Sequence, residues 1–119
     1  MALYIIEKLV SDTLILDLRG RIVLGEETES LRHEIKRLLD AGHTRIVLNL
    51  EDVIYVDSVG LSTMVACYTS ARKQGAELKL LKLTKRIRDL LQITRLSTVF
   101  ETYDTLEAAQ KSFAAPNNS

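Results

Sequence analysis

Apolar residues follow two different spacings along the chain, and segments with one spacing alternate with segments with the other. Short runs rich in Leu, Ile and Val predict strands at residues 3–10, 13–19, 45–50, 77–83 and within 97–103. Apolar residues three and four positions apart predict amphipathic helices that begin near Glu26, Ser58, Thr84 and Asp104. This order indicates an α/β fold with about four helices and a mixed, largely parallel sheet that opens with an antiparallel hairpin.

Several of the predicted boundaries carry residues that favour turns or helix caps. The pair Ser11-Asp12 separates the first two apolar runs and predicts a tight turn, and Gly20 is predicted to end the second strand. Gly42 suits the position after the first helix, where a left-handed backbone is common. Asp104, with Glu107 three residues later, predicts a capping box at the start of the last helix.

Composition limits where the protein acts and what it binds. With 119 residues, 46% of them hydrophobic, we expect one globular domain over residues 1–113 and a flexible tail at 114–119. Sixteen basic residues balance sixteen acidic ones, so no net charge attracts nucleic acid or an anionic membrane. The single Cys67, the lack of a basic leader and the lack of a long apolar run predict a cytoplasmic protein without direct membrane insertion.

The segment 53–65, VIYVDSVGLSTMV, places a serine at the junction between a predicted strand and a predicted helix. Such junctions gather at the carboxyl ends of parallel strands, where open α/β sheets bind ligands. Asp57 or Ser58 could simply cap the helix, which is the common role of these residues. Alternatively, the Ser58 hydroxyl could accept a phosphate, because a helix N-terminus tolerates negative charge, and Gly60 would then let a partner's backbone approach. The residues alone leave both interpretations open.

Four segments together resemble one known family over residues 3–113. The segments VDSVGLSTMV, RIVLNLEDVIY, LRGRIVLG and LLKLTKRIRDLLQITRL are similar to those of STAS domains, and in particular of bacterial anti-sigma factor antagonists. The resemblance implies that Ser58 is phosphorylated by a partner that is both a serine kinase and an anti-sigma factor. It also implies that the unphosphorylated form binds this partner and releases the sigma factor. ATP and Mg²⁺ would then belong to the partner, and the chain itself would need no cofactor.

The resemblance also suggests which residues contact the partner. In the family, the loop after the second strand lies near the acceptor serine. The expected contact residues are Arg21, Ile22, Val23, Leu24, Asp57, Ser58, Val59, Gly60 and Ser62. This chain departs from the family at residues 22–24, which are apolar where members often have an acidic or small polar residue.

Ser62 and Thr63 are either secondary phosphate acceptors or ordinary helix hydroxyls. Arg21 and residues 84–86 either contact an acidic partner or are solvated charges.

Enzyme classes fit the sequence poorly. A hydrolase elbow needs a small residue two positions before the nucleophile, where this chain has Val56. A phosphorylated aspartate receiver needs an acidic pair after the first strand, and none is present there. His33 and His43 are isolated, so no metal site is predicted.

Besides the phosphorylation switch, two functions stay open: a non-switching STAS subunit of an ABC-type lipid transporter, and a component of a larger sensory assembly.

Overall fold

A computed structural model gives the structure of residues 2–113, which form one five-stranded sheet with four helices. The strands are β1 (Leu3–Val10), β2 (Thr13–Ile22), β3 (Arg45–Val56), β4 (Glu77–Leu81) and β5 (Thr102–Tyr103), adjacent in that order. The helices are α1 (Glu26–Asp40), α2 (Ser58–Lys73), α3 (Lys85–Ile93) and α4 (Leu106–Ser112). β1 pairs antiparallel with β2 and the other pairs are parallel, so the predicted mixed sheet is confirmed. The predicted tail at 114–119 lies outside the described residues.

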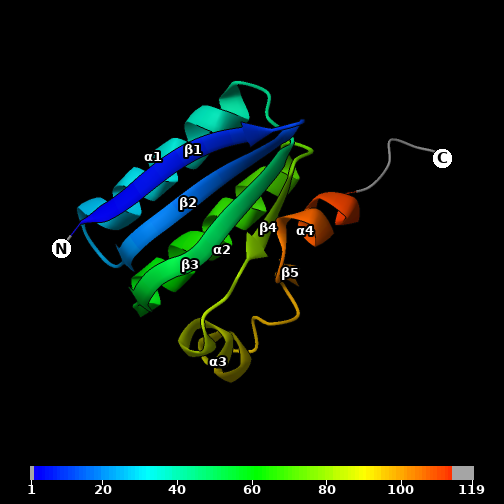
Figure 1. Ribbon diagram of the computed structural model, residues 1–119. Helices are drawn as coiled ribbons and strands as arrows, with labels where there is room; N and C mark the ends of the chain where they lie inside the picture. Colours follow the sequence, from blue (N-terminus) through cyan, green and yellow to red (C-terminus); the bar gives the residue numbers. More distant parts are fainter. Residues whose placement is uncertain (1, 114–119) are drawn as a thin grey trace.

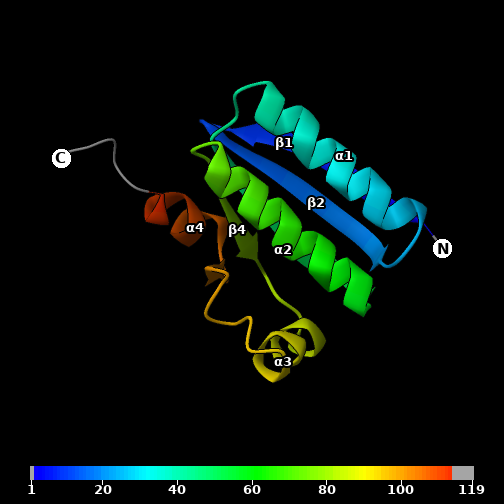
Figure 2. The same ribbon diagram turned by 180° about the vertical axis from the view of Figure 1, so that it is seen from behind.

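The sheet carries helices on both faces, and each face has its own core. Helices α1 and α2 lie side by side on one face, α4 lies on the other, and α3 lies beyond one end of the strands (Figures 1 and 2). The main core lies under α1 and α2 and includes Leu14, Leu16 and Leu18 of β2. A smaller core lies under α4 and contains Ile15, Val47, Leu81, Ala109 and Phe113. The alternation of β2 therefore serves two cores, one for each face of the strand.

Strand β3 extends six residues beyond its predicted end at Leu50. The prediction stopped too early because two irregularities in the pairing with β2 interrupt the alternation of buried residues. Asp17 pairs with Asn49 but Arg19 pairs with Asp52, and Gly20 pairs with Val53 but Arg21 pairs with Tyr55. Each shift is a β-bulge that adds one residue to β3. The spacing of inward-facing residues consequently changes from two to three, as the buried set Ile46, Leu48, Leu50, Val53 and Val56 shows. A strict two-residue period cannot predict this half of the strand.

Gly20 lies inside β2 and does not end it, which corrects the sequence prediction. Its φ is 113°, and an added Cβ would lie 2.3 Å from the Ala2 carbonyl oxygen. The glycine is thus needed for the close approach of the first residues of the chain, and the strand continues to Ile22. β4 ends two residues earlier than predicted, at Leu81, where Lys82 adopts a φ of 57°.

The turn at Ser11 and the helix end at Gly42 are confirmed, whereas the cap of the last helix differs from the prediction. Ser11, with φ 56°, lies in the two-residue turn that the pair Val10 and Thr13 closes. Gly42 follows α1 with φ 93°, as predicted. The last helix is capped by Thr105, whose hydroxyl accepts a hydrogen bond from the Ala108 N–H at 3.1 Å. The predicted cap at Asp104 was therefore wrong by one residue, and the predicted capping box does not form, because the third residue after Thr105 is Ala108 and not a glutamate.

Candidate functional site

Asp57 is the N-cap of α2, and its side chain joins two segments that are distant in the sequence. Oδ1 accepts a hydrogen bond from the Gly60 N–H at 2.6 Å, and Oδ2 accepts one from the Leu24 N–H at 3.0 Å. The Asp57 N–H donates to the Ile22 carbonyl at 3.3 Å. These bonds fix the loop between β2 and α1 against the first turn of α2, so the capping interpretation of Asp57 is confirmed.

The same hydrogen bonds determine the ionisation of Asp57. The Leu24 N–H is the largest influence and lowers the pKa of the carboxyl group, and the Gly60 and Val59 N–H groups lower it further. Partial burial raises the pKa, but by less than the hydrogen bonds together lower it. The side chain therefore remains a carboxylate down to a lower pH than a free aspartate, and a fixed negative charge lies beside Ser58.

Gly60 is buried, and the end of β2 occupies the space that a Cβ would need. An added Cβ would lie 1.9 Å from the Ile22 carbonyl oxygen, which is far inside any allowed contact. The glycine lets the first turn of α2 rest directly on the end of β2. The structure thus gives Gly60 an internal role, and its expected role in the approach of a partner stays a prediction.

Ser58 is the first residue of α2 and is exposed to solvent. Its carbonyl accepts a hydrogen bond from the Ser62 hydroxyl at 3.0 Å, whereas its own hydroxyl makes no hydrogen bond to any residue of the range 2–113. The first turn of α2 contains no acidic residue, so the only carboxylate that caps the positive end of the helix is Asp57. An enzyme or a partner can reach this hydroxyl without opening the fold.

The other expected contact residues divide into surface and core. Leu24 is 70% exposed, and Arg21 and Ser62 are also exposed. Val23 and Val59 are half-buried. Ile22 is 0% exposed and packs in the core, so it is excluded from direct contact with a partner. The apolar loop that the sequence suggested thus presents chiefly one large side chain, that of Leu24.

Two further side chains that the sequence singled out are internal. Thr63 is 1% exposed, and its hydroxyl donates to the Val59 carbonyl at 2.8 Å. It is therefore a buried helix hydroxyl and not a second phosphate acceptor. Cys67 is buried, and burial raises the pKa of its thiol to about 11. At neutral pH the thiol is therefore protonated and unreactive, in agreement with the predicted role as a small core residue.

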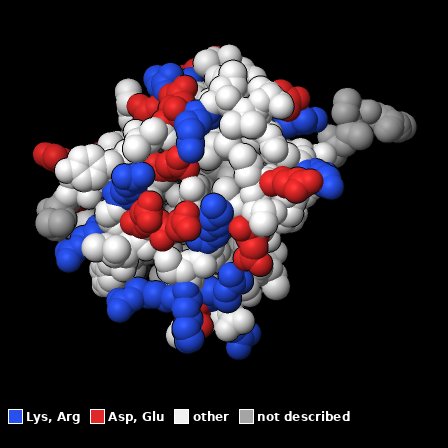
Figure 3. Space-filling view, in the orientation of Figure 1, with Lys and Arg blue, Asp and Glu red and all other residues white. Residues whose placement is uncertain are grey.

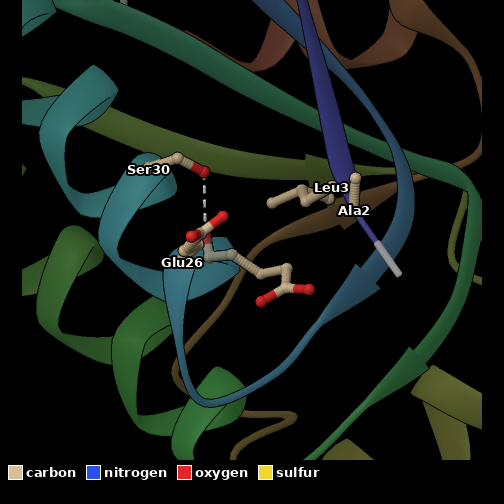
Figure 4. A pocket seen from close by; sticks show the side chains of 5 residues that line it. Ala2, Leu3, Glu26 and Ser30 are labelled. Atoms are coloured by element: carbon tan, nitrogen blue, oxygen red, sulfur yellow. Dashed lines mark hydrogen bonds between the residues drawn. The ribbon is translucent and has the colours of Figure 1, made fainter.

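A hollow of about 510 Å³ at the start of α1 offers no comparable chemistry. It is lined by Ala2, Leu3, Glu26, Glu27 and Ser30 (Figure 4). The Ser30 hydroxyl is engaged, because it donates to the Glu27 carbonyl at 3.0 Å. The two carboxylates project from the first turn of α1, where their negative charge interacts favourably with the positive end of the helix dipole. We therefore assign these glutamates to helix stability.

Comparison with known proteins identifies the family of the chain. The model of the STAS domain matches residues 4–109. The chain belongs to the STAS domain family. This STAS domain is 34% identical over 83 residues to the anti-sigma-B factor antagonist of Listeria monocytogenes, covering 66% of this chain and 73% of the relative.

Solved structures show the same fold. A candidate anti-sigma factor antagonist of Thermotoga maritima matches this STAS domain with a TM-score of 0.83 and 25% identity, covering 90% of this chain and 92% of the other. The Bacillus cell fate determinant SpoIIAA in its phosphorylated form matches with a TM-score of 0.72 and 20% identity, covering 93% and 100%. The STAS domain thus resembles regulatory proteins, and no helix within residues 2–113 has the length and apolar character that a bilayer span requires.

Proposed function

We propose that this STAS domain is an anti-sigma factor antagonist controlled by phosphate on Ser58. In its unphosphorylated form it binds an anti-sigma factor that is also a serine kinase, and the sigma factor is released. Phosphorylation of Ser58 by that kinase, with ATP and Mg²⁺ bound by the kinase, abolishes the binding. This exchange would take place in the cytoplasm, where sigma factors act. The proposal rests chiefly on one observation: the Ser58 hydroxyl is exposed and free, and the scaffold around it does not depend on it.

The surroundings of Ser58 explain why a phosphate would act on binding and not on folding. A phosphoserine carries roughly −1.5 to −2 charges at neutral pH. The positive end of the α2 dipole favours that charge, although Asp57 already accepts the Gly60 N–H and its carboxylate opposes the phosphate. In a complex, the same charge would be desolvated beside the apolar side chains of Leu24 and Val59. A loss of about 2.7 kcal/mol of binding free energy weakens affinity roughly a hundredfold.

The direct test uses purified anti-sigma factor kinases from the source organism, each incubated with the chain and ATP. We expect intact-mass analysis to show one added phosphate and peptide mapping to locate it on Ser58. Ser58→Ala should receive no phosphate, whereas the control Ser70→Ala, an exposed serine near the other end of α2, should be modified like the wild-type chain. Phosphate on another residue, or none with any kinase, would contradict the proposal.

Binding measurements with the same kinase, loaded with ADP, separate a switch from a constitutive adaptor. We expect Ser58→Ala to bind like the unmodified wild-type chain and Ser58→Asp to bind at least about tenfold more weakly, because only the latter places a charge in the contact. Equal affinities for both variants would favour a non-switching role, such as a transporter subunit or part of a larger assembly.

A further inference from the structure

Positive charge is concentrated at the end of the molecule that α3 forms. The segment 82–95 contains five basic residues, Lys82, Lys85, Arg86, Arg88 and Arg95, and one acidic residue, Asp89, although the whole chain has no net charge. All five basic residues are exposed. Figure 3 shows Lys and Arg side chains gathered at the lower end of the molecule, over α3. The segment 82–95 therefore has a formal net charge of +4.

Three of these basic residues have acidic neighbours and two do not. Lys85 pairs with Asp89 at 2.8 Å, Arg88 with Asp104 at 3.7 Å and Lys82 with Glu51 at 3.7 Å. Arg86 and Arg95 make no ion pair with any residue between 2 and 113. Their charges are thus available to an external group.

The same helix presents apolar side chains beside the unpaired Arg86. Ile87 and Leu91 are buried in the core, but Leu90 is only half-buried and Ile93 is 80% exposed. Arg86, Leu90 and Ile93 are spaced by four and three residues, so they lie on one face of α3. With Val56 of β3, and with Lys85 and Asp89, they line a shallow hollow of about 420 Å³. We call the residues Arg86, Leu90 and Ile93 the α3 stripe.

The α3 stripe lies beside the end of β3, the strand that leads into α2. Val56, which contributes to the hollow, is the residue immediately before Asp57 and two residues before Ser58. On another side of the same junction, Leu24 is fixed to Asp57 through its N–H. Leu24 is thus bonded to Asp57, the residue before Ser58, and Ile93 lines a hollow with Val56, two residues before Ser58. Both Leu24 and Ile93 are strongly exposed apolar residues.

We propose that the α3 stripe is a second contact region of the surface that binds the anti-sigma partner. The partner would offer a small apolar pocket for Ile93 bordered by carboxylates that pair with Arg86. This inference rests on the proposed function and assigns to it a second contact region besides the start of α2. The occupant is identified by complementarity: an exposed isoleucine and an unpaired guanidinium fit an apolar pocket with an acidic border.

A membrane or a nucleic acid fits the α3 stripe less well than a protein does. Helix α3 has nine residues, and two of its apolar residues already serve the core, so little apolar area remains for insertion into a lipid surface. The segment 82–95 contains no aromatic residue on which a base could stack. The charged residues are interleaved with the apolar ones in the manner of a protein interface.

The test compares single variants for binding to the kinase that modifies Ser58, loaded with ADP. Ile93→Ser and Arg86→Glu should each weaken binding by about tenfold or more, since each removes one anchor of a small interface. Leu9→Ser, which changes another strongly exposed apolar residue on the distant hairpin, and Lys73→Glu, at the far end of α2, should bind like the wild-type chain. Binding of Arg86→Glu should also depend less on salt concentration.

Different results would overturn different statements. If Ser58→Asp abolishes binding while Ile93→Ser and Arg86→Glu bind normally, the proposed function stands and the role of the α3 stripe is wrong. If the wild-type chain binds no kinase of the source organism, both are wrong. Binding to phosphatidylglycerol vesicles or to a DNA duplex that Arg86→Glu abolishes would assign the stripe to a different ligand and overturn the inference.

Discussion

Asp57 holds three segments in place through its carboxylate and its backbone N–H. One oxygen caps α2 and the other fixes Leu24, while the backbone N–H binds the end of β2. Ser58, its neighbour, contributes nothing comparable to the scaffold. The two adjacent residues thus have separate roles: Asp57 builds the junction, and Ser58 remains available on its surface.

Replacement of Asp57 by alanine should lower the free energy of unfolding by about 0.5–2 kcal/mol at pH 7, the usual range for loss of an N-cap. The folded-state pKa of Asp57 is lowered, so the stabilisation that ionisation provides is present above the unfolded-state pKa and is lost as the pH falls through the folded-state pKa. Urea titrations at neutral pH and at about pH 3 should therefore show a smaller difference between variant and wild type at the lower pH. Asp52→Ala, which changes an exposed carboxylate on β3, serves as the control. A difference independent of pH would contradict the assigned role of the carboxylate.

Gly60→Ala offers a case in which two effects have opposite signs. In an exposed helix interior, alanine is favoured over glycine by about 1 kcal/mol. Here the added Cβ would lie 1.9 Å from the Ile22 carbonyl oxygen, and overpacking of this kind typically costs about 1–3 kcal/mol or more. We expect the steric cost to prevail, with a clear drop in the urea midpoint relative to the wild-type chain. An unchanged or raised midpoint would show that the first turn of α2 can shift without cost.

At the scale of elements, a buried lysine links α4 to the sheet, in addition to the small core beneath the helix. Lys79 of β4 is 2% exposed, and its ammonium group donates to the Ser112 carbonyl at 3.0 Å and to the Ser112 hydroxyl at 2.9 Å. It also forms an ion pair with Glu101 at 2.9 Å and lies 4.5 Å from the centre of the Phe113 ring. The hydrogen bond with Lys79 is the first cause of the lowered pKa of Glu101. The short helix α4, which could not be stable alone, is held by these contacts and by its small core.

Lys79→Ala should therefore loosen α4 selectively. We expect faster hydrogen exchange over residues 106–112 and a loss of about 2–4 kcal/mol in the free energy of unfolding, because a buried stem and its polar contacts disappear together. Lys79→Met, which retains the apolar stem beside Phe113, should recover part of that loss. Lys111→Ala, which removes a lysine exposed on α4 itself, is the matched control. Equal exchange rates over residues 106–112 in all variants would contradict the anchoring role.

The order of the elements could be predicted from the sequence, because most of them keep a regular apolar period. The second half of β3 could not, since its bulges change the spacing of the buried residues from two to three. The location of Ser58 at the start of α2 follows from local pattern and was predicted. The bond between Leu24 and Asp57 joins residues 33 positions apart, and no local pattern encodes it. Likewise, the proximity of α3 to Val56 depends on where the chain crosses the end of the sheet.

At the scale of the whole molecule, the proposed switch should leave the fold unchanged. Ser58 is exposed, and exposed substitutions usually change stability by less than about 0.5 kcal/mol. Ser58→Asp and the phosphorylated chain should therefore melt within about 4 °C of the unmodified protein, with the same far-UV circular dichroism. Amide chemical shifts should change near residues 57–62 and not in α4. A large fall in the melting temperature would mean that loss of binding results from unfolding.

The close contact between α2 and β2 at Gly60 limits how far the first turn of α2 can move. With no side chain between the helix and the Ile22 carbonyl, there is no compressible layer that could absorb a displacement at this point. A modification of the neighbouring serine consequently has no easy path by which to deform the interior. If Ser58 is phosphorylated, the effect is therefore expected at the surface, where a binding partner would meet altered charge on an otherwise unchanged end of the molecule.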